Sequence, residues 1–183
     1  MTKHTDVMID LETLGVAPGC IILSIAAVPF DVGYELEPFY ETISMESCAE
    51  YGLHTNPITV AWWEKQESSV RAEAFSGTRD LKLVLGSFSY WLSQLPEKPV
   101  LWGNGCDFDN PILAAAYDAV DMRRPWSYKD NCCFRTVRAM FSMIPYIPPL
   151  QVHNALHDAT AQAAHMERIY QWLYQKGVRA NAA

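Results

Sequence analysis

The sequence predicts an α/β domain with a mixed sheet, and three observations indicate this class. Three apolar, β-rich segments separated by turn residues occupy the first 44 positions. Helix-like and strand-like segments then alternate from about position 56. The chain has 183 residues, of which 50% are hydrophobic, and this suits one domain with a sizeable core. A three-stranded antiparallel meander is therefore expected to be joined by parallel strands through right-handed crossovers, with helices flanking the sheet.

The segment Val7–Thr13 is the expected central strand. Side chains alternate faces along a strand, so Asp10 and Glu12 point the same way. Such close carboxylates repel each other, and burial without a partner would neutralise one or disrupt the site. A divalent cation is the simplest partner, and hard oxygen ligands suit Mg²⁺ or Mn²⁺. Alone, Asp-x-Glu is a weak signal that a solvated strand edge also explains.

The next two strands are expected over residues 20–31 and 39–44, where apolar and β-branched residues are frequent. Gly15 and Gly19 mark the turn before the first of them, and Asp31–Gly33 marks the turn after it. Connections this short favour antiparallel pairing.

The later elements follow from caps, apolar spacing and breakers. Asn56 and Asn110 are expected N-caps, because each precedes a proline that suits the first helical position. Gly177 is a natural helix stop. A single domain is expected over residues 1–177, with a loose tail at 178–183. Helices are expected near 57–66, 68–75, 80–95, 111–117, 135–143 and 155–176, and short strands at 100–102 and 131–134.

Acidic residues stand where strands end, which is where ligands gather in such sheets. The first strand leads into Asp10 and Glu12, and the strand at 100–102 leads into a loop that carries Asp109. The last helix has Asp158 in its first turn, with His153 just before the helix.

These five residues, in this order, make the chain similar to the DEDDh 3′–5′ exonucleases of the DnaQ-like, ribonuclease-H-fold superfamily. The resemblance spans nearly the whole chain. The matching motifs are Ile9-Asp10-Leu11-Glu12-Thr13, Asn104 through Phe108-Asp109, and His153-x₄-Asp158. The Trp62-Trp63 helix and the Trp102–Gly105 loop look most like a phage- and prophage-borne subgroup that includes bacterial ribonuclease AS.

The resemblance implies a ribonuclease-H-like sheet and release of nucleoside 5′-monophosphates from the 3′ ends of single-stranded DNA or RNA. It also implies two divalent ions, Mg²⁺ or Mn²⁺, about 4 Å apart. Asp10 would bridge both ions, and Glu12 and Asp158 would complete the site for the attacking water. Asp109 would hold the second ion, mostly through water. His153 would accept the proton of the attacking water.

Substrate contacts are also implied by the resemblance. Leu14 would wedge against the terminal bases, and the backbone near Thr13 would meet the 3′ end. A tryptophan stacked on a base contributes about 1–3 kcal/mol in single-strand binders. One of the two adjacent tryptophans is expected to be core instead, and the sequence does not say which. Together, the expected contact residues are Leu11, Thr13, Leu14, Trp62, Trp63 and Asn104.

Three assignments have competitors. Asp107 competes with Asp109 in the same loop, although the apolar residue that follows Phe108-Asp109 favours Asp109. His157 adjoins Asp158 but would project away from its helix face, which favours His153. The densest basic stretch either touches the substrate backbone or forms a solvated face; it comprises Arg123, Arg124, Lys129, Arg135 and Arg138.

Composition and charge exclude some classes of protein. The net charge of −7 argues against a protein that coats nucleic acid by bulk electrostatics, although bound cations invert the charge of an acidic cleft. No window is apolar and long enough to span a membrane, and the N-terminus lacks a signal-peptide pattern. The five cysteines show no Cys-x-x-Cys spacing. Reduced thiols and a cytosolic setting, in a bacterium or a phage-infected host, are therefore expected.

Two rival functions remain. A catalytically inactive ribonuclease-H-fold module that binds nucleic acid would normally lack one of the carboxylates, and all are present here. A His-Asp metal phosphohydrolase built on His157-Asp158 would need a largely helical domain. A homodimer is suggested only by the resemblance to ribonuclease AS.

Overall fold

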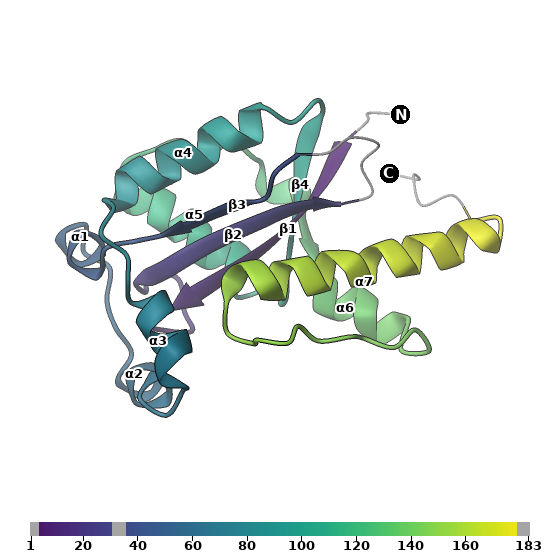
Figure 1. Ribbon diagram of the computed structural model, residues 1–183. Coiled ribbons are helices and arrows are strands. Elements are labelled where there is room, and N and C mark those ends of the chain that lie inside the picture. Colours follow the sequence, from purple (N-terminus) through teal and green to yellow (C-terminus); the bar gives the residue numbers. More distant parts are fainter. Residues whose placement is uncertain (1–3, 31–35, 179–183) are drawn as a thin grey trace.

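The computed structural model describes residues 4–30 and 36–178 and has three layers (Figure 1). A five-stranded sheet in the order β3-β2-β1-β4-β5 lies between helices on both faces. The strands are β1 His4–Thr13, β2 Ile22–Phe30, β3 Phe39–Thr42, β4 Lys98–Gly103 and β5 Asn131–Cys133. The helices are α1 Met45–Glu50, α2 Pro57–Trp63, α3 Ser68–Ala74, α4 Leu81–Ser93, α5 Asp109–Ala119, the 3₁₀ turn η1 Tyr128–Asp130, α6 Phe134–Met140 and α7 Ala155–Gln175.

The strand directions confirm the expected mixed sheet. β1 pairs antiparallel with β2, and β2 pairs antiparallel with β3. β4 lies parallel to β1, and β5 lies parallel to β4. The turn expected at Asp31–Gly33 falls outside the described residues, and so do positions 179–183 of the expected tail.

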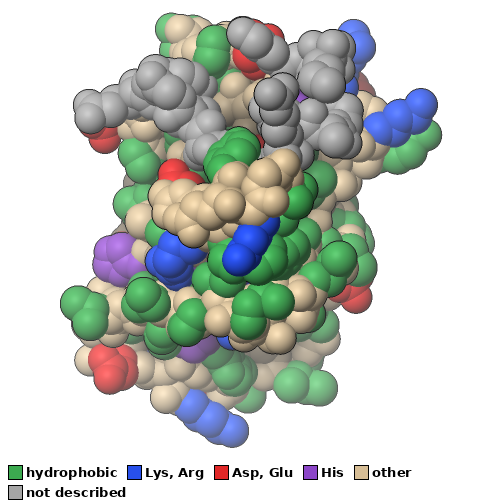
Figure 2. All heavy atoms as spheres, turned by 90° about the vertical axis from the view of Figure 1, so that its right-hand side faces the viewer, with side chains coloured by type: hydrophobic (Ala, Val, Ile, Leu, Met, Phe, Trp, Pro, Cys, Tyr) green, Lys and Arg blue, Asp and Glu red, His purple; other side chains and the backbone are tan. Residues whose placement is uncertain are grey.

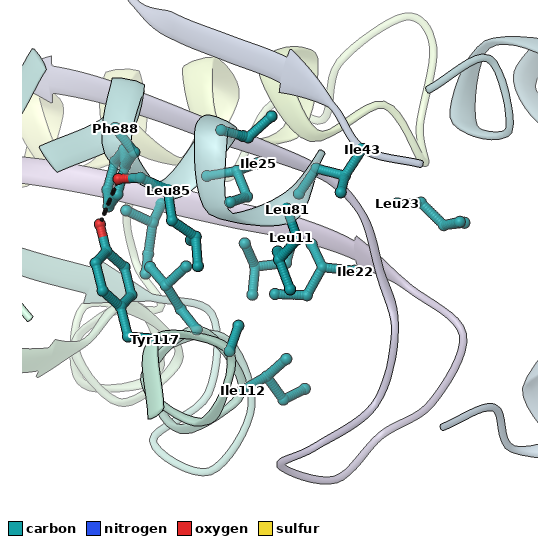
Figure 3. Close-up of a cluster of buried hydrophobic side chains, with 14 of the residues drawn as sticks. Leu11, Ile22, Leu23, Ile25, Ile43, Leu81, Leu85, Phe88, Ile112 and Tyr117 are labelled. Atoms are coloured by element: carbon teal, nitrogen blue, oxygen red, sulfur yellow. Dashed lines mark hydrogen bonds between the residues drawn. The ribbon is translucent and has the colours of Figure 1, made fainter. Parts of the chain in front are cut away.

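β1 is buried on both faces, and its alternation divides the core in two. Val7, Ile9 and Leu11 pack toward α4 and α5, in the cluster that Figure 3 shows from within. There Tyr117 of α5 donates a hydrogen bond to the carbonyl of Leu85 in α4, at 3.0 Å. Met8 faces the other way, into a cluster with residues of α6 and α7. Asp10 and Glu12 follow Met8 on that second face, so the sheet directs them toward α7.

Two local expectations differ from the structure. Asn56 does cap α2, since its side chain accepts the N–H of Ile58 at 2.9 Å. The assignment of Asn110 as a cap is wrong, because α5 already begins at Asp109. Asn110 instead lies buried and donates to the carbonyl of Leu101, which ties α5 to β4.

Figure 2 shows one face, on which Lys and Arg side chains are interspersed with hydrophobic and uncharged ones. Within residues 4–30 and 36–178, none of the helices combines the length and apolarity needed to cross a membrane.

Candidate active site

Three carboxylates converge where β1 ends and α7 begins. One oxygen from each of Asp10, Glu12 and Asp158 lies within 4.8 Å of the other two. The strand alternation brings the first two to one face, and α7, packed across β1 and β2, supplies the third from its first turn. This spacing allows all three to bind one cation.

Asp109 enters the same cavity from the first turn of α5. Its Oδ1 accepts the N–H of Leu11 at 3.2 Å, and its Oδ2 accepts the N–H of Asn104 at 2.8 Å. The close approach of α5 depends on Gly103. A Cβ there would lie 2.5 Å from Oδ1 of Asn110 and 3.0 Å from Oδ2 of Asp109. Asp107, the competing candidate, is exposed and does not line the cavity.

Neighbouring groups orient two of the carboxylates. Gln162 of α7 donates to Oδ1 of Asp10 at 2.8 Å. The backbone N–H of His153 donates to Oδ2 of Asp158 at 2.8 Å. Sequence reasoning missed Gln162, although its position four residues after Asp158, on the same helix face, could have drawn attention to it.

Burial is the main cause of raised pKa values across the cluster. It raises the pKa of Glu12 to about 8, helped by the negative charges of Asp158 and Asp109. It raises the pKa of Asp109 to about 7, against the hydrogen bonds from Asn104 and Leu11. The pKa of Asp10 is raised by burial and by all three other carboxylates, and burial also raises that of Asp158. Burial therefore favours the protonated carboxyl groups, and a bound cation would displace these protons.

His153 lies in a constrained loop beside these groups. Its φ of 63° falls in the left-handed region, which is uncommon for a residue with a side chain. Its ring packs edge-on against Trp62, with 4.8 Å between ring centroids, and it lines the cavity. His157 is exposed and is not among the residues that line this cavity.

The residue after His153 anchors the loop to the rest of the fold. Asn154 caps α7 by accepting the N–H of His157 at 3.1 Å. Its amide donates to Oε1 of Glu73 in α3, which also accepts the hydroxyl of Tyr40 in β3 at 3.1 Å. Glu73 of α3, which also accepts the hydroxyl of Tyr40, thus anchors the loop that carries His153.

The cavity around these groups measures about 530 Å³, which is ample for a nucleotide-sized ligand. The two tryptophans have different positions in it. Trp62 is 38% exposed, whereas Trp63 is 2% exposed and donates its indole N–H to the carbonyl of Thr13 at 2.9 Å. Trp62 is therefore the one available for stacking, and Trp63 is the core member of the pair.

The structure brings nearly all the expected site residues together. The cavity is lined by Asp10, Leu11, Glu12, Thr13, Trp62, Trp63, Asn104, Asp109, His153 and Asp158. Leu14 is the exception, because it is 3% exposed and packs in the core. A register shift between Glu12 and Thr13 breaks the strand alternation just before it. Val16, which the sequence reasoning did not select, lines the cavity instead.

Comparisons with known proteins place this geometry in context. A family described as the 3′–5′ exoribonuclease Rv2179c-like domain matches residues 5–170. An exodeoxyribonuclease of Enterobacteria phage T4 is 28% identical over 121 residues, which are 59% of this chain and 53% of the phage protein. The matched region thus spans about half the length of this curated relative.

Solved structures share the fold at low sequence identity. E. coli Exonuclease I in complex with a 5cy-dA13 oligonucleotide aligns with a TM-score of 0.61 and 16% identity, over 94% of this chain and 43% of that one. The nuclease domain of 3′hExo, a DEDDh family member bound to rAMP, aligns with a TM-score of 0.56 and 12% identity, over 97% of this chain and 96% of that one. The ribonuclease-H-like fold expected from the sequence is therefore confirmed.

Proposed function

This chain belongs to the Rv2179c-like 3′–5′ exoribonuclease domain family, and from that premise we propose that it is a divalent-metal-dependent 3′–5′ exonuclease. Its substrate would be the 3′ end of single-stranded nucleic acid, and its product a nucleoside 5′-monophosphate. Residues 1–177 would act as one catalytic domain. The observation that carries the proposal is the convergence of four carboxylates and His153 in one cavity.

The donor set fits Mg²⁺ or Mn²⁺, because it consists of hard carboxylate oxygens. Asp10, Glu12 and Asp158 are close enough to share an ion. The charge of Asp109 also contributes to the raised pKa of Asp10, so Asp10 interacts with every other carboxylate of the cluster. This central position would suit Asp10 to bind both ions. When bound, the two ions would stabilise the attacking and leaving oxygens of the phosphodiester displacement.

Proton transfer, orientation of the carboxylates and contact with the terminal base would depend on side chains and backbone groups of this chain. His153 would accept the proton of the attacking water, and the perpendicular packing of its ring against Trp62 restricts the orientation of the ring. Backbone N–H groups of Leu11 and Asn104 keep Asp109 aimed into the cavity. The exposed part of Trp62 offers an aromatic face to a terminal base.

A time course on 5′-labelled DNA and RNA strands of one sequence tests this function. The reactions contain Mg²⁺, Mn²⁺ or a chelator. A ladder that shortens from the 3′ end and disappears with chelator is expected, and the faster ladder identifies the preferred sugar. Absence of any ladder with either ion would favour the inactive nucleic-acid-binding module, and digestion of covalently closed circles would contradict an exonuclease.

Two further properties are proposed with this function. A cytosolic setting, in a bacterium or a phage-infected host, is supported by the five cysteines, all of which are free thiols.

A homodimer is proposed from the resemblance to ribonuclease AS. Light scattering at working concentration tests it, since a mass equal to one 20.7 kDa chain would refute the dimer.

A further inference from the structure

A second cavity of about 340 Å³ adjoins the carboxylate cavity. It lies against α6 and the segment that follows, and its lining includes Arg135, Arg138, Ser142, Pro145 and Tyr146. Arg135 lines both cavities, so the two meet at this side chain. The volume falls within the range of about 300–1,000 Å³ that is typical of ligand sites.

Arg135 is held at the junction by the loop that positions Asp109. Its guanidinium packs against Gly105, where a Cβ would lie 3.2 Å from one Nη atom. Its positive charge favours the ionised form of Asp109 and so partly offsets the rise in the pKa of that carboxyl that burial causes. Arg135 therefore marks the point where the acidic cavity gives way to a cationic one.

Arg138 lies one helical turn after Arg135, on the same side of α6. Its Cζ sits 4.2 Å from the centroid of the Tyr146 ring, a cation–π contact. Tyr146 is itself packed against Phe134 and His165. A guanidinium carries five N–H donors in a planar fork, so Arg138 can make this ring contact and still offer donors to a bidentate acceptor.

Carboxylates do not occupy these donors. Among residues 4–30 and 36–178, neither Arg135 nor Arg138 has a carboxylate oxygen within 4.0 Å. Two neighbouring guanidinium groups without such partners make this edge of the cavity cationic, although the chain as a whole carries a net charge of −7. Planar, forked donors of this kind match phosphate oxygens.

We propose that Arg135 and Arg138 bind successive phosphates of the strand upstream of its 3′-terminal nucleotide, and that the second cavity holds the nucleotide between them. The strand would then leave the carboxylate cavity over Arg135 and follow α6. This inference rests on the proposed function for the direction of the strand. It resolves the alternatives for the basic stretch by assigning substrate contact to these two arginines. Arg123 and Arg124 line neither cavity, and Arg124 lies 3.8 Å from Asp118.

Fluorescence anisotropy with Arg138→Ala tests the proposal. Labelled single strands of two and eight nucleotides, as DNA and as RNA, are titrated with Ca²⁺ in place of Mg²⁺ and checked for integrity on a gel afterwards. The matched control is Arg123→Ala, which makes the same change in net charge at an exposed arginine outside both cavities. Arg138→Lys is the conservative variant, because it keeps the charge and loses the forked donors.

The eight-nucleotide strand is expected to bind Arg138→Ala about tenfold more weakly than wild type, as for the loss of one charged hydrogen-bonded contact. The slope of log affinity against log salt should fall by about 0.7, the value for one phosphate contact on a single strand. The affinity of Arg138→Lys should lie between those of Arg138→Ala and wild type, and the affinity of Arg123→Ala should match that of wild type.

Two results would overturn the proposal. One is wild-type affinity and salt slope in Arg138→Ala. The other is an equal loss on the two-nucleotide and eight-nucleotide strands, because a subsite for the upstream strand must depend on length. The wild-type exonuclease assay separates the two claims. If wild type produces the ladder but Arg138→Ala binds the strand normally, only this inference is refuted. If binding depends on Arg138 but wild type produces no ladder, the exonuclease function is refuted and the strand site stands.

Discussion

Asp107 and Asp109 stand two positions apart in one loop but have opposite environments. Asp109 is 1% exposed and accepts two backbone N–H groups, whereas Asp107 is exposed. We therefore predict that Asp109→Asn lowers the rate of nucleotide release by at least about 100-fold, while Asp107→Asn changes it by less than about twofold. Initial rates on a labelled oligonucleotide check this pair. A comparable loss in both variants would show that the wrong carboxylate has been assigned to the metal site.

The two histidines near the start of α7 form a second matched pair. His153 lines the cavity, and His157 is exposed on the helix surface. His153→Ala should lower kcat by about 10²–10⁴-fold, as expected for loss of a general base, with Mn²⁺ affinity largely retained. His157→Ala should retain wild-type kcat. Single-turnover rates together with a metal titration separate catalysis from metal binding, and a wild-type rate in His153→Ala would exclude it as the base.

At the scale of single residues, the sequence predicts the carboxylates of the site better than it predicts which apolar side chains are buried. Asp10, Glu12, Asp109 and Asp158 converge as their order and spacing predict. Leu14, whose contact with the terminal bases was implied by the resemblance, does not reach the cavity, because the strand register shifts between Glu12 and Thr13 just before it.

At the scale of elements, the loop before α7 is anchored to α3, which in turn is hydrogen-bonded to β3. Glu73 accepts hydrogen bonds from Tyr40 and from Asn154, the residue that follows His153. Glu73→Ala should lower kcat by about tenfold, the lower end of the effect of losing an outer partner of a metal site. Glu73→Gln keeps an acceptor oxygen and should restore most of the rate.

Thermal unfolding distinguishes this role from a general loss of stability. The positioning role predicts that Glu73→Ala keeps the KM for the oligonucleotide while kcat falls. If Glu73→Gln is as impaired as Glu73→Ala, the acceptor function is not what matters. A wild-type kcat in both variants would remove Glu73 from the positioning of His153.

The elements themselves were predictable where they are long or clearly bounded. α4 and α7 lie within a few residues of their expected limits, since apolar spacing and Gly177 define them. α1 was missed, because six residues are too few to show a helical period, and its main signal is the Ser44 cap. Asn110 was misassigned because its buried contact with the carbonyl of Leu101 is a tertiary feature.

For the whole molecule, the buried carboxylates link stability to pH and metal. The pKa of Glu12 rises from 4.5 to about 8, and that of Asp109 from 3.8 to about 7. The metal-free folded state therefore binds more protons than the unfolded state between these limits. The stability that these two groups contribute is fully present below their unfolded pKa values and is lost as the pH rises through the folded ones.

We accordingly predict that the Tm of the metal-free protein decreases between pH 6 and pH 8.5, and that Mn²⁺ raises it more at pH 8.5 than at pH 6. Cations and protons compete for the same oxygens, so the metal effect is larger where fewer protons are bound. Differential scanning fluorimetry with chelator or Mn²⁺ measures both. Glu12→Gln should reduce the pH dependence, and a metal-free Tm that rises with pH over this interval would contradict the assignment.

The most direct measurement is the binding of Mn²⁺ to the metal-free protein by calorimetry at pH 8, in the presence of a nucleoside 5′-monophosphate. The carboxylates at the end of β1 are predicted to bind two ions per chain, with both lost or greatly weakened in Asp10→Asn. A wild-type chain that binds no Mn²⁺, or an Asp10→Asn variant that binds it as wild type does, would contradict a catalytic metal site in this cavity.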